Sequence, residues 1–144
     1  MEDHLTKEQR SVNMSRIRSK DTKPEIVFRQ RLHSLGYRYS LHKKNLPGKP
    51  DLYLRKYNLA IFIHGCFWHR HKGCSRCTFP TQNKEYWSAK FKKNVEHDKK
   101  VYRELKRQKM NLLVFWECEI KPKKMDELDK KIIINIEKCR GNLK

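Results

Sequence analysis

Hydrophobic residues at helical spacing predict three helices in this chain. The first is expected over 23–35, because Thr22 and Glu25 form a capping-box pattern before the apolar positions and Gly36 follows them. A long second helix is expected over 84–108, and a third lies in the C-terminal part of the chain. The three apolar stripes are Phe28, Leu32 and Leu35; Trp87, Phe91, Val95, Tyr102 and Leu105; and Met125, Leu128, Ile132 and Ile136.

Short apolar segments between these helices predict four strands. Polar and apolar residues alternate over 37–41, as in a half-buried strand, and a second short strand is expected over 51–54. The continuous apolar run 59–63 is typical of a strand covered on both faces, and 112–116 is similar. The order strand, long helix, strand across 59–116 predicts a parallel right-handed crossover. The fold class is therefore α/β, a central mixed β-sheet flanked by helices.

The length of the chain indicates the number of domains, and its charge indicates the kind of partner. The 144 residues suit one domain over 1–144, and 35 basic against 16 acidic residues give a net charge of +19. A polyanionic partner is expected, while 37% hydrophobic residues disfavour a disordered basic tail. Residues 1–20 are expected to form a basic arm or helix that docks, with Met14 and Ile17 among its cations. The longest apolar run is too short to cross a bilayer and no signal region is visible, so we expect a soluble cytoplasmic protein without a membrane partner.

Cysteine and histidine residues crowd into one loop after 59–63. Three of the five cysteines lie within twelve residues, beside three of the seven histidines, which favours metal ligation over disulfides. A closed structural zinc site of three cysteines and one histidine is expected. Cys77 and Cys118 compete for the fourth position, because Cys77 forms a local pair with Cys74 whereas Cys118 follows the strand 112–116. The candidate ligands are Cys66, His71, Cys74, Cys77 and Cys118.

Acidic and histidine residues at neighbouring strand ends indicate phosphodiester chemistry. Asp51 stands near the end of one strand, and His64 and His69 follow the next strand. Hydrolysis of a phosphodiester needs a carboxylate to hold Mg²⁺ and a base beside the attacking water. Asp51 can also be an ordinary turn residue and either histidine a structural one. Asp98 lies on the inward stripe of the long helix, so its carboxylate needs a partner.

Adjacent aromatic residues in the same loop suggest contacts with bases. Phe67 and Trp68 cannot both bury easily against one core, and in a strongly basic protein such a pair suits stacking or wedging between bases. Packing against the loop itself is the alternative for one of the two.

The motifs of this chain together resemble those of the very short patch repair (Vsr) DNA mismatch endonucleases. The likeness runs nearly end to end, and HGCFWH after a PGxPD element is its most specific part. The matching segments are RSVNMSRIRSKDT at 10–22, LPGKPDL at 46–52, IFIHGCFWHRHKGC at 61–74, EYWSAKFKKNVEHD at 85–98 and VFWEC at 114–118.

The resemblance implies a fold, a reaction and a set of partners. The fold would be a restriction-endonuclease-like core with a structural zinc, acting as a monomer in the bacterial cytoplasm. The reaction would be nicking of one strand of double-stranded DNA on the 5′ side of the thymine in a T:G mismatch, which arises when 5-methylcytosine deaminates. A cognate cytosine methyltransferase and mismatch-repair proteins would be functional partners.

The resemblance also implies a role for each site residue. Asp51 and the main-chain carbonyl of Ile63 would bind the catalytic Mg²⁺, and His69 would activate water. His64, supported by Glu25, would assist at the phosphate or leaving group, while Asp98 would orient His69. The implied zinc ligands are Cys66, His71, Cys74 and Cys118. The residues implied to contact DNA are Phe67, Trp68 and Trp87 beside the mismatch and Met14 and Ile17 in the minor groove.

Three departures from the family pattern leave alternatives open. Position 63 is Ile where family members often have Thr, Cys77 is an extra thiol, and the lysine of the wider nuclease motif is absent, so a histidine must replace it. A zinc-stabilised DNA-binding module without catalysis would share the charge, the aromatics and the zinc. A restriction nuclease on the same scaffold is a third possibility.

Overall fold

The computed structural model describes residues 21–140, so the predicted arm with Met14 and Ile17 lies outside the described residues. Its three α-helices are α2 (Lys23–Ser34), α3 (Lys84–Arg107) and α4 (Met125–Arg140). Its strands are β1 (Ser40–Leu41), β2 (Leu52–Leu54), β3 (Leu59–His64) and β4 (Asn111–Trp116). Short 3₁₀ turns occupy Arg55–Tyr57, Glu117–Glu119 and Pro122–Lys124. No helix within 21–140 has both the length and the apolar character needed to cross a bilayer.

The four strands form one mixed sheet in the order β1-β2-β3-β4, which confirms the predicted fold class. β1 pairs antiparallel with β2 across the loop 42–51, and β2 pairs antiparallel with β3 across the short turn 55–58. β3 and β4 pair parallel, with His64 opposite Trp116 at their carboxyl ends. The strand, helix, strand segment is therefore a parallel crossover, as predicted.

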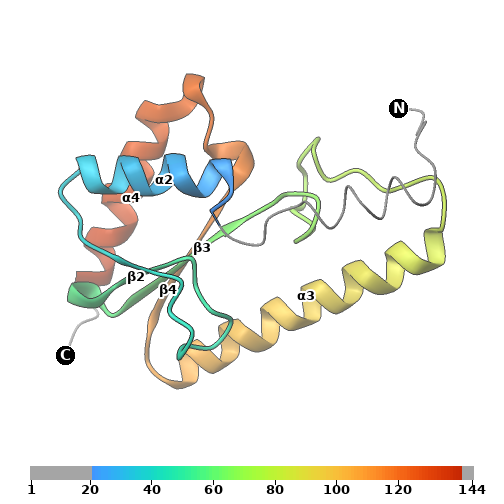
Figure 1. The fold of residues 1–144 in the computed structure, drawn as a ribbon, viewed down its shortest axis with the longest axis horizontal. Helices are drawn as coiled ribbons and strands as arrows, with labels where there is room; N and C mark the ends of the chain where they lie inside the picture. Colours follow the sequence, from blue (N-terminus) through green and yellow to red (C-terminus); the bar gives the residue numbers. More distant parts are fainter. Residues whose placement is uncertain (1–20, 141–144) are drawn as a thin grey trace.

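Helices cover both faces of this sheet (Figure 1). α2 and α4 lie together on one face, where Phe28 and Phe115 pack with ring centroids 4.7 Å apart in the larger hydrophobic core. α3 lies on the other face, and Val101 and Leu105 pack against alternate residues of β3 in a smaller core. Both faces of β3 are thus buried, which explains its continuous apolar sequence. Cys139 of α4 also belongs to the larger core.

The N-terminal half of α3 extends beyond the sheet, and the chain between β3 and α3 runs beside it (Figure 1). The apolar stripe of this half therefore has no sheet to cover. Instead, Trp87 and Phe91 contact Phe67, with ring centroids 5.8 and 5.0 Å away. The same periodic stripe thus serves the core at one end of α3 and the Cys/His loop at the other.

One predicted strand is wrong in length and exposure. Instead of a half-buried strand over 37–41, the structure has only the two-residue β1, and Leu41 is 41% exposed. Tyr39 donates its hydroxyl to the carbonyl of Arg29, and the Tyr37 ring packs on Tyr57, so both aromatic side chains serve the helical layer rather than a strand ladder. The other elements lie within one or two residues of the predicted ranges where these were given.

Gly48 allows the loop before β2 to approach α3. Its φ is +73°, and a Cβ placed there would overlap a methyl group of Val101. Gly36 has a similar φ of +94°, but a Cβ there would meet nothing. Among the glycines within 21–140, only Gly48 therefore combines a positive φ with a close approach.

We expect Gly48→Ala to destabilise the protein by about 1–3 kcal/mol more than Gly36→Ala, because both strain the backbone but only the first overpacks the core. Urea unfolding of the two variants measures the difference. Val101→Ala in the Gly48→Ala background should recover most of it. Equal losses of unfolding free energy in the two glycine variants would show that the close approach of Gly48 to Val101 does not contribute to the cost.

Candidate active site and metal centre

Four of the five predicted catalytic side chains meet in one pocket at the carboxyl end of β3, and Glu25 does not line it. The pocket has a volume of about 190 Å³, and Asp51, His64, His69 and Asp98 all line it. Asp51 precedes β2, the two histidines end and follow β3, and Asp98 comes from α3. Antiparallel pairing of β2 with β3 and packing of α3 on the sheet bring these three segments together.

Asp51 is a poorly solvated carboxylate with few protein donors. Its Oδ2 accepts the backbone N–H of Ile63 at 2.7 Å, which places it against the end of β3. Burial raises its pKa to about 6, although the Ile63 N–H and the nearby His42 and His69 oppose the shift. Its negative charge is therefore undercompensated, and a cation in the pocket would stabilise the ionised form.

His69 and Asp98 form a hydrogen-bonded pair. Nδ1 of His69 lies 2.7 Å from Oδ2 of Asp98, so the carboxylate predicted to need a partner has one. Because an ionised carboxylate can only accept, Nδ1 carries the proton and Nε2 of the neutral ring is free to accept one. This arrangement suits His69 as a general base whose ring is oriented by the carboxylate of Asp98.

His64 is buried beside His69, only 4% exposed. The two imidazoles stack with centroids 3.7 Å apart and planes 12° from parallel. Burial and the neighbouring His69 lower the pKa of His64 to about 3, so the ring is neutral at physiological pH. Nε2 of His64 is hydrogen-bonded to the hydroxyl of Tyr102.

Glu25 is also buried, but its polar partners differ from those of His64. Its Oε1 lies 3.1 Å from Nε2 of His42, and its Oε2 accepts the backbone N–H of Asp21. Burial raises its pKa, and its charge in turn raises the pKa of Asp51. The structure thus brings Glu25 within electrostatic range of Asp51 rather than into hydrogen bonding with His64. Asp21, Glu25 and His42 lie close enough to bind a metal, but Arg29 already forms ion pairs with both carboxylates.

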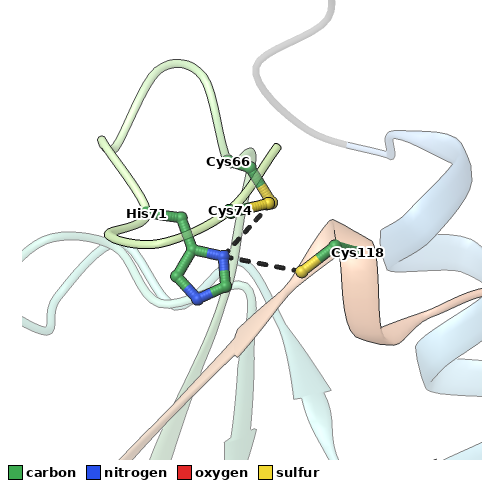
Figure 2. A group of neighbouring side chains, drawn as sticks. All are labelled: Cys66, His71, Cys74 and Cys118. Atoms are coloured by element: carbon green, nitrogen blue, oxygen red, sulfur yellow. Dashed lines mark hydrogen bonds between the residues drawn. The ribbon is translucent and has the colours of Figure 1, made fainter. Parts of the chain in front are cut away.

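A second cluster lies just beyond the pocket and can hold a metal ion. Cys66, His71, Cys74 and Cys118 place one ligand atom each within 4.8 Å of one another (Figure 2). Three come from the loop after β3, and Cys118 comes from the turn after β4. Among the described residues, Cys118 rather than Cys77 completes this set. Burial raises the pKa of the Cys66 and Cys118 thiols, so a bound cation is needed to hold them as thiolates.

Trp116 and Glu117 join the two clusters. The indole of Trp116 stacks on His71 with centroids 4.1 Å apart, and it also contacts the ring of His64 at 5.4 Å. Glu117 accepts the backbone N–H of Cys66 at 3.1 Å. Trp116 is therefore packed between the cysteine cluster and the histidine pair.

The aromatic residues predicted to contact DNA within the described residues gather where the loop after β3 packs against the start of α3. Phe67, Trp68 and Trp87 are each partly exposed, and their rings lie 5.1 to 5.9 Å apart. Arg70 packs beneath them, its guanidinium 3.9 Å from the Phe91 centroid, and donates to the carbonyls of Phe67 and Thr78. The three rings therefore pack against one another and still leave part of their surface open to solvent.

Sequence reasoning missed several residues that complete these sites. Tyr102 was placed on the apolar stripe of α3, yet its hydroxyl reaches His64. Arg70 and Trp116 lie within the matching segments 61–74 and 114–118 but were given no role there. The signal available for Tyr102 was its position four residues after Asp98, one helical turn further along the same face.

Comparison with known proteins identifies relatives over most of the chain. Residues 2–76, about half of the chain, match a family model described as DNA mismatch endonuclease Vsr. The "Type II nicking enzyme V.XorIIP" of Xanthomonas oryzae pv. oryzae is 42% identical over 83% of this chain and 88% of its own length. The "Type II nicking enzyme V.NmeAIP" of Neisseria meningitidis is 43% identical over 85% and 87%. The "DNA mismatch endonuclease Vsr" of Escherichia coli is 36% identical over 84% and 77%.

The four-residue cluster predicts which thiols hold the metal. Cys118→Ser should lose most of the bound metal, because it removes one of four ligands, whereas Cys77→Ser should keep it. Metal content of the purified variants by elemental analysis checks this. Metal loss from the Cys77 variant with retention in the Cys118 variant would contradict the assignment.

Asp51 should reduce stability where it is ionised. Its folded pKa of about 6 lies above its ordinary 3.8, so the folded state resists losing the proton that the unfolded state gives up. Asp51→Asn should therefore stabilise the Mg²⁺-free protein by on the order of 1–3 kcal/mol well above pH 6, and the gain should disappear below about pH 4. Urea unfolding against pH measures this, with Asp126→Asn on exposed helix surface as the control. A gain independent of pH would contradict it.

Proposed function

The chain belongs to the Vsr family and is a DNA endonuclease; from this premise we propose that it nicks one strand of double-stranded DNA on the 5′ side of the thymine in a T:G mismatch. The proposed reaction is Mg²⁺-dependent phosphodiester hydrolysis with His69 as the base. The observation that carries the proposal is that Asp51 and His69 line the same pocket, where one phosphate can meet both. Action as a monomer in the bacterial cytoplasm, after a cytosine methyltransferase and alongside mismatch-repair proteins, is part of the same proposal.

His69 is suited to take a proton from water. Asp98 holds its Nδ1–H at 2.7 Å, which fixes the ring and stabilises the imidazolium that forms when Nε2 accepts the proton. The side chain of His69 is 30% exposed, so water can reach it. The side chain of Asp98 is only 15% exposed, so its burial restricts the carboxylate to a position beside His69.

His64 is suited to a different task from that of His69. Its burial and lowered pKa keep it neutral, so it can donate one hydrogen bond to the phosphate or leaving group without adding charge. The stacked rings share one side of the pocket, so His64 and His69 can face the same phosphate. Glu25 acts in this proposal through the charge it places near Asp51.

The surroundings of Asp51 fit a magnesium ion. A carboxylate oxygen is the ligand that Mg²⁺ prefers, and because burial raises the pKa of Asp51 to about 6, a bound cation would stabilise its ionised form. Mg²⁺ bound there would neutralise charge that develops on the scissile phosphate. The main-chain carbonyl of Ile63 is the second proposed ligand, since Ile63 also lines the pocket.

The cysteine cluster fits a structural zinc ion. With Zn–S near 2.3 Å and Zn–N near 2.0–2.1 Å, tetrahedral geometry separates sulfur and nitrogen by about 3.5–3.6 Å. Nδ1 of His71 lies 3.5 Å from Sγ of Cys66 and 3.5 Å from Sγ of Cys118 (Figure 2). Four protein ligands leave no open position, so this ion would brace the loop that carries His69 rather than act on substrate.

The aromatic cluster and the basic surface support recognition of a mismatched duplex. Partly exposed Phe67, Trp68 and Trp87 can wedge between base pairs, and a T:G mismatch stacks less firmly than a matched pair, so unstacking there costs less. Exposed lysines of α3 and the net charge of +19 supply phosphate contacts.

The proposal predicts that nicking requires the Asp51 carboxylate, Mg²⁺ and a T:G mismatch in the duplex. Asp51→Asn keeps the shape of the side chain and its bond to Ile63, so nicking of a T:G heteroduplex should fall by about 10³-fold or more while DNA binding changes little. Nicking is followed on denaturing gels, and binding by fluorescence anisotropy in Ca²⁺. Asp126→Asn, with the same change of charge, should nick normally.

Three outcomes would contradict parts of this account. Equal nicking of T:G and matched duplexes would remove mismatch specificity. Undiminished nicking by Asp51→Asn would remove the proposed catalytic centre, and binding without nicking by the wild type would favour the non-catalytic DNA-binding module. Double-strand cuts at unmodified sites would indicate a restriction nuclease.

A further inference from the structure

We propose that Tyr102 is a positioning residue that fixes His64, and through it the stacked histidine pair, for phosphodiester cleavage. This inference rests on the proposed function, because it assigns a role within the same pocket. Tyr102 does not line the pocket, so it acts through His64 rather than on substrate.

The geometry places Tyr102 behind His64. Its hydroxyl is hydrogen-bonded to Nε2 of His64, across 38 positions of sequence. Its ring packs edge-on to Phe62 of β3, with centroids 6.0 Å apart, which limits the directions the hydroxyl can take. A buried imidazole nitrogen without such a partner would be costly, so this bond specifies the ring orientation of His64.

The bond also decides which nitrogen of His64 remains for substrate. Either the tyrosine hydroxyl donates to Nε2 or Nε2–H donates to the hydroxyl oxygen, and in both cases Nε2 is engaged by the protein. Nδ1 is then the nitrogen left for the phosphate or leaving group. Donation by the hydroxyl places the ring proton on Nδ1, the form that can donate to a phosphate oxygen.

One helix thus holds both rings of the pair. Asp98 and Tyr102 are four residues apart on α3, so they lie on the same face one turn apart. Asp98 fixes His69 through Nδ1, and Tyr102 fixes His64 through Nε2. Because the rings are in face-to-face contact at 3.7 Å, a tilt of His64 would displace His69.

Tyr102→Phe tests this with the loss of one oxygen atom. We expect the single-turnover nicking rate on a T:G heteroduplex to fall by about 3- to 30-fold, since one hydrogen bond is lost, with DNA affinity unchanged. Tyr37→Phe is the matched control, because it removes a tyrosine hydroxyl bonded to Glu137 on the opposite side of the sheet. That variant should nick at the wild-type rate.

A spectroscopic readout separates positioning from general stability. The ¹⁵N resonances of the His64 ring report which nitrogen carries the proton, and Tyr102→Phe should shift them whereas Tyr37→Phe should not. Unchanged His64 resonances, or a wild-type nicking rate in Tyr102→Phe, would overturn the proposal. If the wild-type protein fails to nick T:G duplexes, the proposed function fails, and the ¹⁵N spectra still decide whether Tyr102 controls His64.

Discussion

Parallel pairing of β3 with β4 is the constraint on which both candidate sites depend. The register places His64 opposite Trp116, so the two strands end at the same edge of the sheet. The residues that follow them, Cys66 on one side and Cys118 on the other, are therefore neighbours although 52 positions apart in sequence. A parallel connection needs a long crossover, and α3 is that crossover. The helix that makes the pairing possible also brings Asp98 to the pocket and Tyr102 to His64.

The two clusters have complementary electrostatic needs. Asp51 and the buried thiols are costly to ionise without a cation, while His64 is costly to protonate. Such groups lower the stability of the metal-free fold, and their grouping at one edge of the sheet is typical of a functional site rather than of core packing. Trp116 contacts both His71 and His64, so the two clusters share one packed side chain.

Much of the fold could be predicted from hydrophobic spacing, because α3 and α4 each bury a face with a helical period and β3, buried on both faces, is a continuous apolar run. The length of the first strand could not, since the aromatic rings of Tyr37 and Tyr39 pack toward the helical layer and the pattern does not say which layer takes them. The need of Asp98 for a partner was predictable from its place on a buried stripe, and the hydrogen bond to His69 meets it.

Individual side-chain contacts could not be predicted from the sequence, for a geometric reason. The angle at which α3 crosses the sheet decides whether Tyr102 reaches His64 and whether Arg70 reaches Phe91, and periodicity carries no information on that angle. Glu25 shows the same limit, because its burial beside His42 depends on how α2 lies over the loop before β2. The roles implied by resemblance remain predictions, and the pocket supplies the geometry in which they can be tested.

The most direct test of the central claim is nicking of a T:G heteroduplex that carries a single phosphorothioate at the scissile position. If Asp51 holds a magnesium ion against that phosphate, sulfur in place of the contacting oxygen should slow nicking in Mg²⁺, and the softer Mn²⁺ should restore it. Sulfur in the other diastereomer should show no such metal dependence. Equal rates in both metals for both diastereomers would contradict contact between an Asp51-bound ion and the phosphate.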